Sequence, residues 1–145
     1  MSLKMYTGVK LYCVWLEQAI ISGAIQKPPV AIDPLPHVTM SFQDAGPTGY
    51  ITADQLTGPL PSSFTVISVE YWEEPDITVA VLDPMQFKEA RECYDRMGLT
   101  YLDYPFRPHA TLCKGNHIDG LQQLVGKSFM HMDTFVGRSS NNVKA

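Results

Sequence analysis

Two short segments decide the fold of this chain: Pro36-His37-Val38-Thr39 and Pro108-His109-Ala110-Thr111. Alternate residues of a strand point to the same face, so the histidine and the threonine of each segment project together. A proline before the histidine favours an extended entry into the strand. Both segments are therefore predicted to begin strands, each with an imidazole and a hydroxyl on one face.

The pattern of elements around these segments occurs twice. His109 follows His37 by 72 positions, and a shift of that size aligns the two parts of the chain. The first copy is expected as a strand over 6–14, a helix over 15–21, a connection over 26–36 and a strand over 37–42. The second is expected as a strand over 77–82, a helix over 84–97, a connection over 98–107 and a strand over 109–114. Residue identity between the copies is low, so the repeat is one of pattern. It predicts two lobes related by a pseudo-twofold axis.

Further strands are expected over 50–56, 63–72 and 128–137, and a short helix over 119–125 with Asp119 as its N-cap. The wholly apolar strand over 77–82 is expected to be buried on both faces. Phe129 and Phe135 are the expected core anchors of the last strand. Together these elements predict a single α+β domain over residues 1–145.

Composition narrows the classes of function. The formal net charge is −4, whereas proteins that bind long nucleic acid are usually basic, so a small phosphorylated ligand is the more suitable partner. The odd number of cysteines, three, gives no disulfide framework and favours a reducing, cytoplasmic setting. No apolar signal core and no long apolar run is present, which disfavours secretion and membrane insertion.

Two imidazoles and two hydroxyls on facing strands suit phosphodiester cleavage. One histidine can take a proton from the attacking hydroxyl or water, and the other can protonate the departing oxygen. Thr39 and Thr111 can donate hydrogen bonds to the phosphate oxygens as charge builds there. This scheme needs no metal or other cofactor. A zinc site at His109, Cys113 and His117 is disfavoured, because the first two share a strand face but lie roughly 13 Å apart.

The paired His-x-Thr motifs and the duplicated strand-helix frame resemble the 2H phosphoesterase superfamily. The resemblance covers about three quarters of the chain. It implies a bilobal fold in which two pseudo-twofold related antiparallel sheets surround a central cleft, with the helices outside. It also implies that His37, Thr39, His109 and Thr111 carry catalysis on 2′,3′-cyclic phosphates or on 2′-5′ or 3′-5′ linked oligonucleotides.

A narrower resemblance is to the phage anti-CBASS phosphodiesterases, which degrade cyclic di- and trinucleotide messengers of bacterial anti-phage signalling. It is carried by the opening segment 6–12, the segment 69–72 and the aromatic-rich approach 101–107. It implies that Tyr12 binds substrate and that Trp72 stacks on a base. That family also uses an acidic residue on its last strand, where this chain has Asp133 and no glutamate.

Several interpretations stay open at this point. Tyr12 is either a core residue or a ligand contact, Trp72 either stacks on a base or caps the core, and Lys114 either neutralises a phosphate or ends a solvated strand. A 2H enzyme acting on 2′,3′-cyclic phosphate or 2′-5′ linked RNA ends is the alternative activity. A protein that sequesters a cyclic nucleotide without cleaving it is the non-enzyme alternative. The sequence leaves the oligomeric state, and which histidine is acid or base, undetermined.

Overall fold

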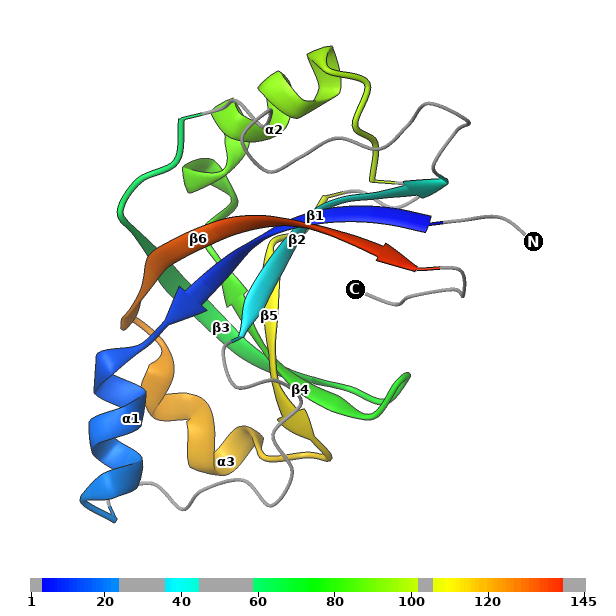
Figure 1. Ribbon diagram of the computed structural model, residues 1–145. Coiled ribbons are helices and arrows are strands. Elements are labelled where there is room, and N and C mark those ends of the chain that lie inside the picture. Colours follow the sequence, from blue (N-terminus) through cyan, green and yellow to red (C-terminus); the bar gives the residue numbers. More distant parts are fainter. Residues whose placement is uncertain (1–3, 24–35, 45–58, 102–105, 140–145) are drawn as a thin grey trace.

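The computed structural model describes residues 4–23, 36–44, 59–101 and 106–139, and in this part of the chain the fold is α+β with a mostly antiparallel sheet (Figure 1). The elements in chain order are β1 (Lys4–Tyr12), α1 (Val14–Ile21), β2 (His37–Asp44), β3 (Ser63–Trp72), β4 (Ile77–Leu82), η2 (Pro84–Gln86), α2 (Lys88–Arg96), β5 (His109–Lys114), α3 (Ile118–Leu121), η3 (Gln122–Leu124) and β6 (Ser128–Ser139).

The strands close into a ring in the order β1-β2-β5-β4-β3-β6. Long antiparallel ladders unite β6, β1 and β2 as one group and β3, β4 and β5 as the other. The groups meet at the pair Val38–Ala110 between β2 and β5, and at a short ladder between β3 and β6. The order is symmetric about the β2–β5 junction. In one direction it runs from β2 to β1 and β6, and in the other from β5 to β4 and β3. In both directions a strand with a His-x-Thr motif is followed by a strand that precedes a helical segment, and then by an outer strand. The repeat seen in the sequence therefore reappears in the strand order, within one closed ring of strands.

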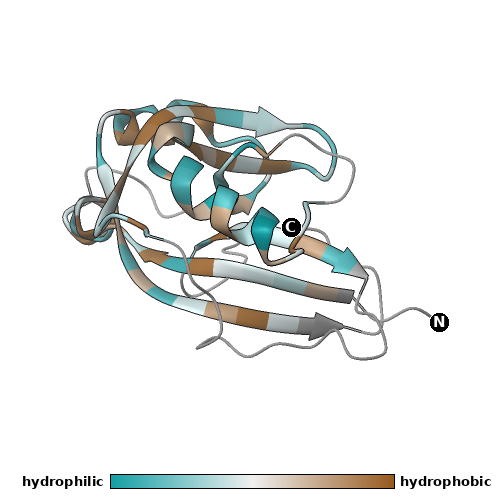
Figure 2. Cartoon of the chain, turned by 90° about the horizontal axis from the view of Figure 1, so that it is seen from above, coloured by the Kyte–Doolittle hydropathy of each residue, from teal (hydrophilic) through white to brown (hydrophobic). Residues whose placement is uncertain are grey.

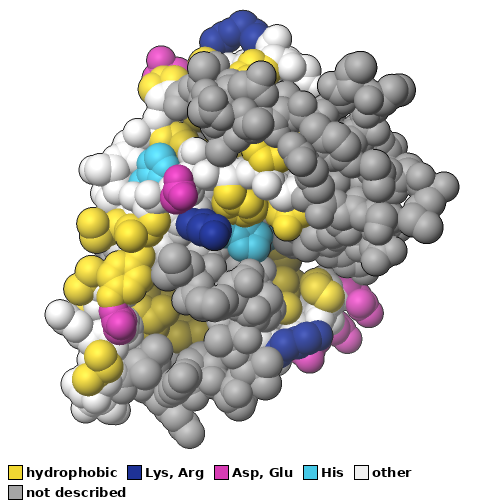
Figure 3. Space-filling model, viewed as in Figure 1, with side chains coloured by type: hydrophobic (Ala, Val, Ile, Leu, Met, Phe, Trp, Pro, Cys, Tyr) yellow, Lys and Arg dark blue, Asp and Glu magenta, His cyan; other side chains and the backbone are white. Residues whose placement is uncertain are grey.

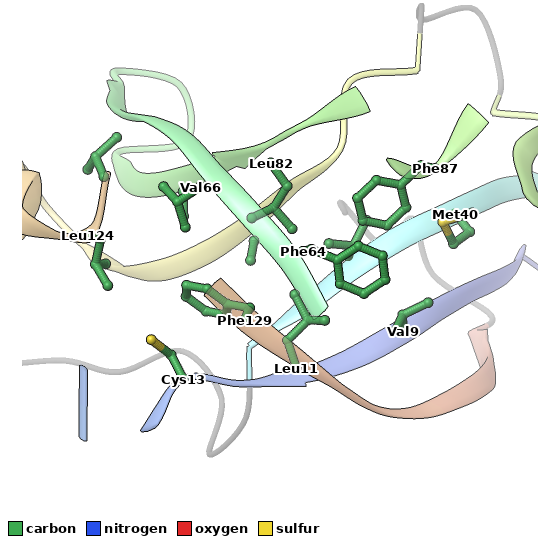
Figure 4. Close-up of a cluster of buried hydrophobic side chains, with 14 of the residues drawn as sticks. Val9, Leu11, Cys13, Met40, Phe64, Val66, Leu82, Phe87, Leu124 and Phe129 are labelled. Atoms are coloured by element: carbon green, nitrogen blue, oxygen red, sulfur yellow. The ribbon is translucent and has the colours of Figure 1, made fainter. Parts of the chain in front are cut away.

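The hydrophobic core lies inside this ring and draws residues from all of its strands. Members of the cluster include Val9 and Leu11 of β1, Val38 and Met40 of β2, Phe64 and Val66 of β3, Ala80 and Leu82 of β4, Ala110 of β5 and Phe129 of β6 (Figure 4). Phe64 stacks on Phe87, with ring centroids 4.4 Å apart and planes 14° from parallel. Each fully buried side chain of this size contributes about 1.5–3 kcal/mol relative to exposure.

The helical segments cover the core at opposite ends of the ring, α2 at one end and α1 with α3 at the other (Figure 1). Helix α2 is mainly hydrophilic in Figure 2, but Ala90 and Tyr94 turn inward and are buried. Arg91 of α2 donates to the backbone oxygens of Met40 and Leu99, at 2.8 and 2.7 Å, and so ties the helix to β2. No helix in the described ranges is long and apolar enough to cross a membrane.

Several element predictions are confirmed. Strands β3, β4 and β5 have the predicted bounds, and every residue of β4 is buried. Gly98, with φ of +81°, ends the α2 region as expected, because this left-handed conformation suits glycine. The predicted strand over 50–56 lies outside the described residues.

Two helix boundaries were predicted incorrectly. The expected helix over 84–97 is divided into η2 and α2, because Asp83 caps the short 3-10 turn by accepting from the Met85 amide at 3.0 Å. Helix α3 begins after His117, so Asp119 lies in its first turn and is not its N-cap.

Candidate active site

The β2–β5 junction places both His-x-Thr segments on one face of the sheet. Val38 and Ala110 form the pair that joins the strands, and both side chains are buried in the core inside the ring. Neighbours along a strand point the opposite way, so the flanking histidines and threonines all project outward. We call this surface the HxT face, defined by His37, Thr39, His109 and Thr111. In an antiparallel pair His37 lies toward Thr111, and Thr39 toward His109.

An apolar strand supports the HxT face beside β5. In the β4–β5 ladder Val81 pairs with His109, and Val79 pairs with Thr111. Both valines are buried, as is Ile77, and Trp72 packs against this small cluster. Strand β4 is thus buried on both sides because one face enters the core and the other supports the site.

The His109 ring is held from two sides. Its Nδ1 lies 2.9 Å from the backbone oxygen of Arg107, and since a carbonyl oxygen only accepts, Nδ1 carries the hydrogen and donates it. The neutral ring then offers Nε2 as an acceptor. The Trp72 indole lies against the same ring, with centroids 4.5 Å apart and planes tilted by 54°.

The surroundings of His109 favour its neutral form. Burial lowers the pKa of His109 from its ordinary 6.5, and the hydrogen bond to Arg107 opposes this. The positive charges of Arg107 and His37 lower the pKa further, while the Glu70 carboxylate raises it. Because burial is the largest cause, the ring is neutral near pH 7 and its Nε2 is free to take a proton.

The His37 side of the face is more polar and more open. His37 is half-buried and pairs with Lys10 of β1, which in turn pairs with Asp133 of β6. Directly paired residues point to the same side, so these three form a charged row across the strands. Lys10 and Asp133 are exposed. Asp133, the acidic residue of the last strand, therefore lies on the HxT face, two strands from His37.

Phe135 is not the core anchor that the sequence predicted. It is half-buried and lies on the HxT face, edge-on to His37 with ring centroids 5.5 Å apart. It pairs with Gly8, whose missing side chain makes room for it: a Cβ there would come within 2.7 Å of the Phe135 ring and of the Val38 carbonyl oxygen. The register of β6, which shifts beside Lys10 and Leu11, decides this outcome.

The two aromatic residues assigned to substrate binding both lie at this surface. Tyr12 is half-buried at the end of β1, two residues beyond Lys10 and so on the same side of the strand. The neighbouring residue Leu11 points the other way, and its side chain is buried in the core. The backbone N–H of Leu11 donates a hydrogen bond to the backbone oxygen of Pro36 at 2.8 Å. Trp72 is half-buried, caps the β4 cluster and contacts His109.

The expectation that His109 and Cys113 share a strand face is wrong. A register shift between β4 and β5 leaves Val79 opposite Thr111 and Thr78 opposite Cys113. This bulge turns Cys113 into the core, where it is fully buried. Among the described residues, no three His, Cys, Asp or Glu side chains gather in a group suited to a metal ion. Lys114 is exposed and lies 3.5 Å from the Pro75 oxygen.

Sequence reasoning gave no role to two charged residues that surround His109. Glu70 and Arg107 form a two-pronged ion pair, with Arg107 nitrogens 2.9 and 2.5 Å from the two carboxylate oxygens. The hydrogen bonds from Arg107 hold the pKa of Glu70 at about 2. The sequence did contain a signal for this pair. Glu70 precedes Trp72 by two residues and Arg107 precedes His109 by two, and residues at this spacing on a strand share a face.

Figure 3 shows how positive charge is distributed among the described residues on one face of the molecule. On the side shown in Figure 3, the Lys and Arg side chains of the described residues lie apart and form no continuous basic patch. A long polyanion finds no track of cations there. No protein-family model, curated protein or solved structure matches this chain.

Proposed function

We propose that this protein is a 2H-type phosphodiesterase that cleaves 3′-5′ linkages of cyclic di- or trinucleotides without a metal ion. One observation carries the proposal: the pairing of Val38 with Ala110 sets both His-x-Thr segments antiparallel, with two imidazoles and two hydroxyls on one face. The bilobal 2H arrangement belongs to the same proposal. It is supported by the strand order, which is symmetric about this pair.

The reaction needs a base and an acid on opposite sides of phosphorus. The base takes the proton of the ribose 2′-hydroxyl, whose oxygen attacks phosphorus as the bond to the 5′-oxygen breaks. The acid gives its proton to that departing 5′-oxygen, so the products are a 2′,3′-cyclic phosphate and a free 5′-hydroxyl. Thr39 and Thr111 donate hydrogen bonds to the non-bridging oxygens, where negative charge grows.

We assign the base to His109 and the acid to His37. His109 is neutral near pH 7 because burial lowers its pKa, and its Nδ1–H is committed to the Arg107 carbonyl. Its Nε2 lone pair is therefore available. His37 is half-buried in the row with Lys10 and Asp133, where it is more open to water than His109, which lies beside the buried valines of β4.

The substrate class rests on the aromatic residues that flank the HxT face. Tyr12 and Trp72 lie on opposite strand groups, so a small two- or three-base ligand suits their placement on either side of the histidines. Stacking of one base on an aromatic side chain contributes about 1–3 kcal/mol. By resemblance, the activity is that of a phage countermeasure to cyclic-nucleotide immune signalling, exerted in the host bacterial cytoplasm.

The test is cleavage of 3′,3′-cyclic GMP-AMP by the full chain in EDTA, followed by chromatography. A panel of other cyclic di- and trinucleotides, a 2′,3′-cyclic mononucleotide and a 2′-5′ linked dinucleotide is run beside it. His37→Ala and His109→Ala are each expected to slow product formation by about 10²- to 10⁴-fold. His117→Ala is the matched control, because His117 is the N-cap residue of α3, its side chain makes no capping hydrogen bond and it is not one of the four residues that define the HxT face; its loss is expected to leave turnover unchanged.

Three results contradict the proposal. Cleavage confined to the 2′,3′-cyclic or 2′-5′ substrates assigns the alternative activity. Cyclic nucleotide that stays bound and intact after long incubation assigns a sequestering protein. Wild-type turnover in both single histidine variants rules out the two-histidine mechanism.

A further inference from the structure

The carboxylate of Glu70 on β3 accepts hydrogen bonds from the residues that contact His109. The oxygens of Glu70 accept from Arg107 at 2.9 and 2.5 Å, from the Trp72 indole nitrogen at 3.2 Å and from the Ser68 hydroxyl at 2.9 Å. Donors thus reach both oxygens, and they come from β3 itself and from the segment that enters β5. Such convergence restrains the carboxylate and its donors together.

Two of these donors also contact His109. Trp72 lies against the imidazole through its ring, and Arg107 accepts the Nδ1–H through its backbone oxygen. The contacts therefore form a closed loop of residues. Glu70 contacts Trp72, Trp72 contacts His109, His109 contacts Arg107, and Arg107 contacts Glu70. The ring contact of the imidazole and its Nδ1 hydrogen bond are thus both made by residues that are hydrogen-bonded to Glu70.

We propose that Glu70 is a positioning residue for His109. It orients the Trp72 indole against the imidazole and anchors Arg107, whose backbone oxygen accepts the Nδ1–H, without itself touching the reacting atoms. Its effect on turnover rests on the proposed function, whereas its effect on the geometry of His109 does not.

The ion pair is better suited to orientation than to stability. The side chains of Glu70 and Arg107 are 31% and 53% exposed, and exposed ion pairs contribute little to folding. The guanidinium fork nevertheless matches the two carboxylate oxygens and fixes their relative orientation. Since the pKa of Glu70 is about 2, the carboxylate stays ionised at every pH at which the histidines titrate.

The experiment follows the imidazole proton resonances of the chain by NMR. The sequence holds four histidines, and His109→Asn identifies the resonance of interest. The Trp72 ring current is expected to displace that resonance in the wild type, because the two centroids are 4.5 Å apart. Glu70→Gln removes the negative charge and replaces one of the two accepting oxygens with an NH₂ group. The Trp72 indole is then held less firmly, and the His109 resonance is expected to move toward the position of a histidine with no aromatic ring beside it.

Glu73→Gln is the matched control, since it makes the same chemical change at an exposed turn residue three positions away. It is expected to leave the His109 resonance in place. Glu70→Gln is expected to lower kcat/KM for the cyclic dinucleotide by about 10- to 100-fold, the usual scale for a misplaced catalytic group. Its melting temperature is expected to shift by no more than about 4 °C.

A second variant covers the case in which Glu70→Gln fails to fold. Arg107→Lys keeps the charge but loses the two-pronged geometry, and it is expected to move the His109 resonance in the same direction by a smaller amount. The proposal is overturned where the folded variants of Glu70 or Arg107 leave this resonance as Glu73→Gln leaves it. A moved resonance in a protein that cleaves none of the nucleotides supports the positioning role and sinks the proposed function alone.

Discussion

The two halves of the HxT face present the same motif on different foundations. On the β5 side, His109 and Thr111 pair with the buried valines 81 and 79 of β4. On the β2 side, His37 and Thr39 pair with Lys10 and Gly8 of β1. The repeat therefore supplies two equivalent histidines, and the middle strand of each half makes them chemically different. The acid and base roles that we propose for the two histidines therefore rest on their neighbours and not on the motif that they share.

The aromatic partners of the two histidines differ in the same sense. Trp72 meets His109 while its indole nitrogen is bonded to Glu70. Phe135 meets His37 edge-on and has no polar atom to anchor it; the Lys10 ammonium lies 5.8 Å from its ring centroid. His109 is thus contacted by a Trp72 ring that is itself hydrogen-bonded to Glu70, whereas the ring beside His37 is an apolar phenyl group.

The largest effect is expected when both halves are disabled together. Each single histidine-to-alanine change is expected to lower kcat by about 10²- to 10⁴-fold. In the mechanism that we propose, both imidazoles act in one displacement, so His37→Ala combined with His109→Ala is expected to lose little more than the worse single variant. Steady-state kinetics of the set measures this. Losses that multiply fully would show that the halves work in separate steps.

The next largest effect is expected on the His37 side alone. Gly8→Ala brings a Cβ to within 2.7 Å of the Phe135 ring and of the Val38 carbonyl oxygen. The carbonyl oxygen belongs to the backbone of β2, so it cannot move aside as the end of a flexible side chain could. We expect a loss of about 1–3 kcal/mol in unfolding free energy and a fall in turnover of about 10- to 100-fold. Denaturant unfolding and kinetics check both.

Gly120→Ala provides the control for that substitution. A Cβ at Gly120 meets nothing within 4 Å, and alanine is favoured over glycine inside a helix by about 0.5–1 kcal/mol. We therefore expect a small gain in stability and unchanged turnover. Equal losses at both glycines would remove the special role of the space beside Phe135.

The pH profile sharpens the assignment of base and acid. A base whose pKa is lowered stays unprotonated to lower pH, so the ascending limb of kcat/KM is expected to have its midpoint below 6.5. The NMR titration of His109 is expected to share that midpoint. A limb that follows the titration of His37 instead would reverse the two roles.

The same shift has a sign for stability. The unfolded chain binds a proton at His109 at a higher pH than the folded chain does, so stability rises with pH through this window and is fully present above about 6.5. Protonation of His109 therefore opposes folding below that pH. His109→Asn is expected to flatten this part of the stability curve in denaturant titrations.

The smallest effect is expected from Glu70 in acid. Its pKa falls from 4.5 to about 2 in the fold, so its contribution is present above pH 4.5 and is lost as pH falls toward 2. Since the pair is exposed, Glu70→Gln is expected to change unfolding free energy at neutral pH by less than about 1 kcal/mol. A larger loss than in Glu73→Gln by several kcal/mol would make the pair a structural element.

Local pattern carried much of the prediction. The bounds of β3, β4 and β5 follow from apolar and β-branched runs that end at turn residues, and the His-x-Thr alternation already placed each histidine beside its threonine. The α+β class is confirmed on the same grounds. These features depend on residues close together in sequence, where spacing decides which side chains share a face.

Features set by pairing between distant segments escaped prediction. The ion pair of Glu70 with Arg107 depends on β3 and β5 flanking β4. The outward position of Phe135 and the inward position of Cys113 depend on register shifts that no local pattern announces. The difference between the two histidines follows from these pairings, so the sequence alone left their roles equivalent.

The closure of the strand ring has a consequence for how the chain is made. Strand β6 pairs with β1 from Lys4 opposite Ser139 to Tyr12 opposite Met130, and it also pairs with β3. During synthesis β1 emerges from the ribosome before β2, β3, β4 and β5, and its partner β6 emerges only after them. Until then β1 and β3 each present an open edge, the form of sheet most prone to pair with other chains. A chain stalled before β6 is accordingly expected to aggregate or to recruit chaperones, whereas in the completed ring β6 pairs with both β1 and β3.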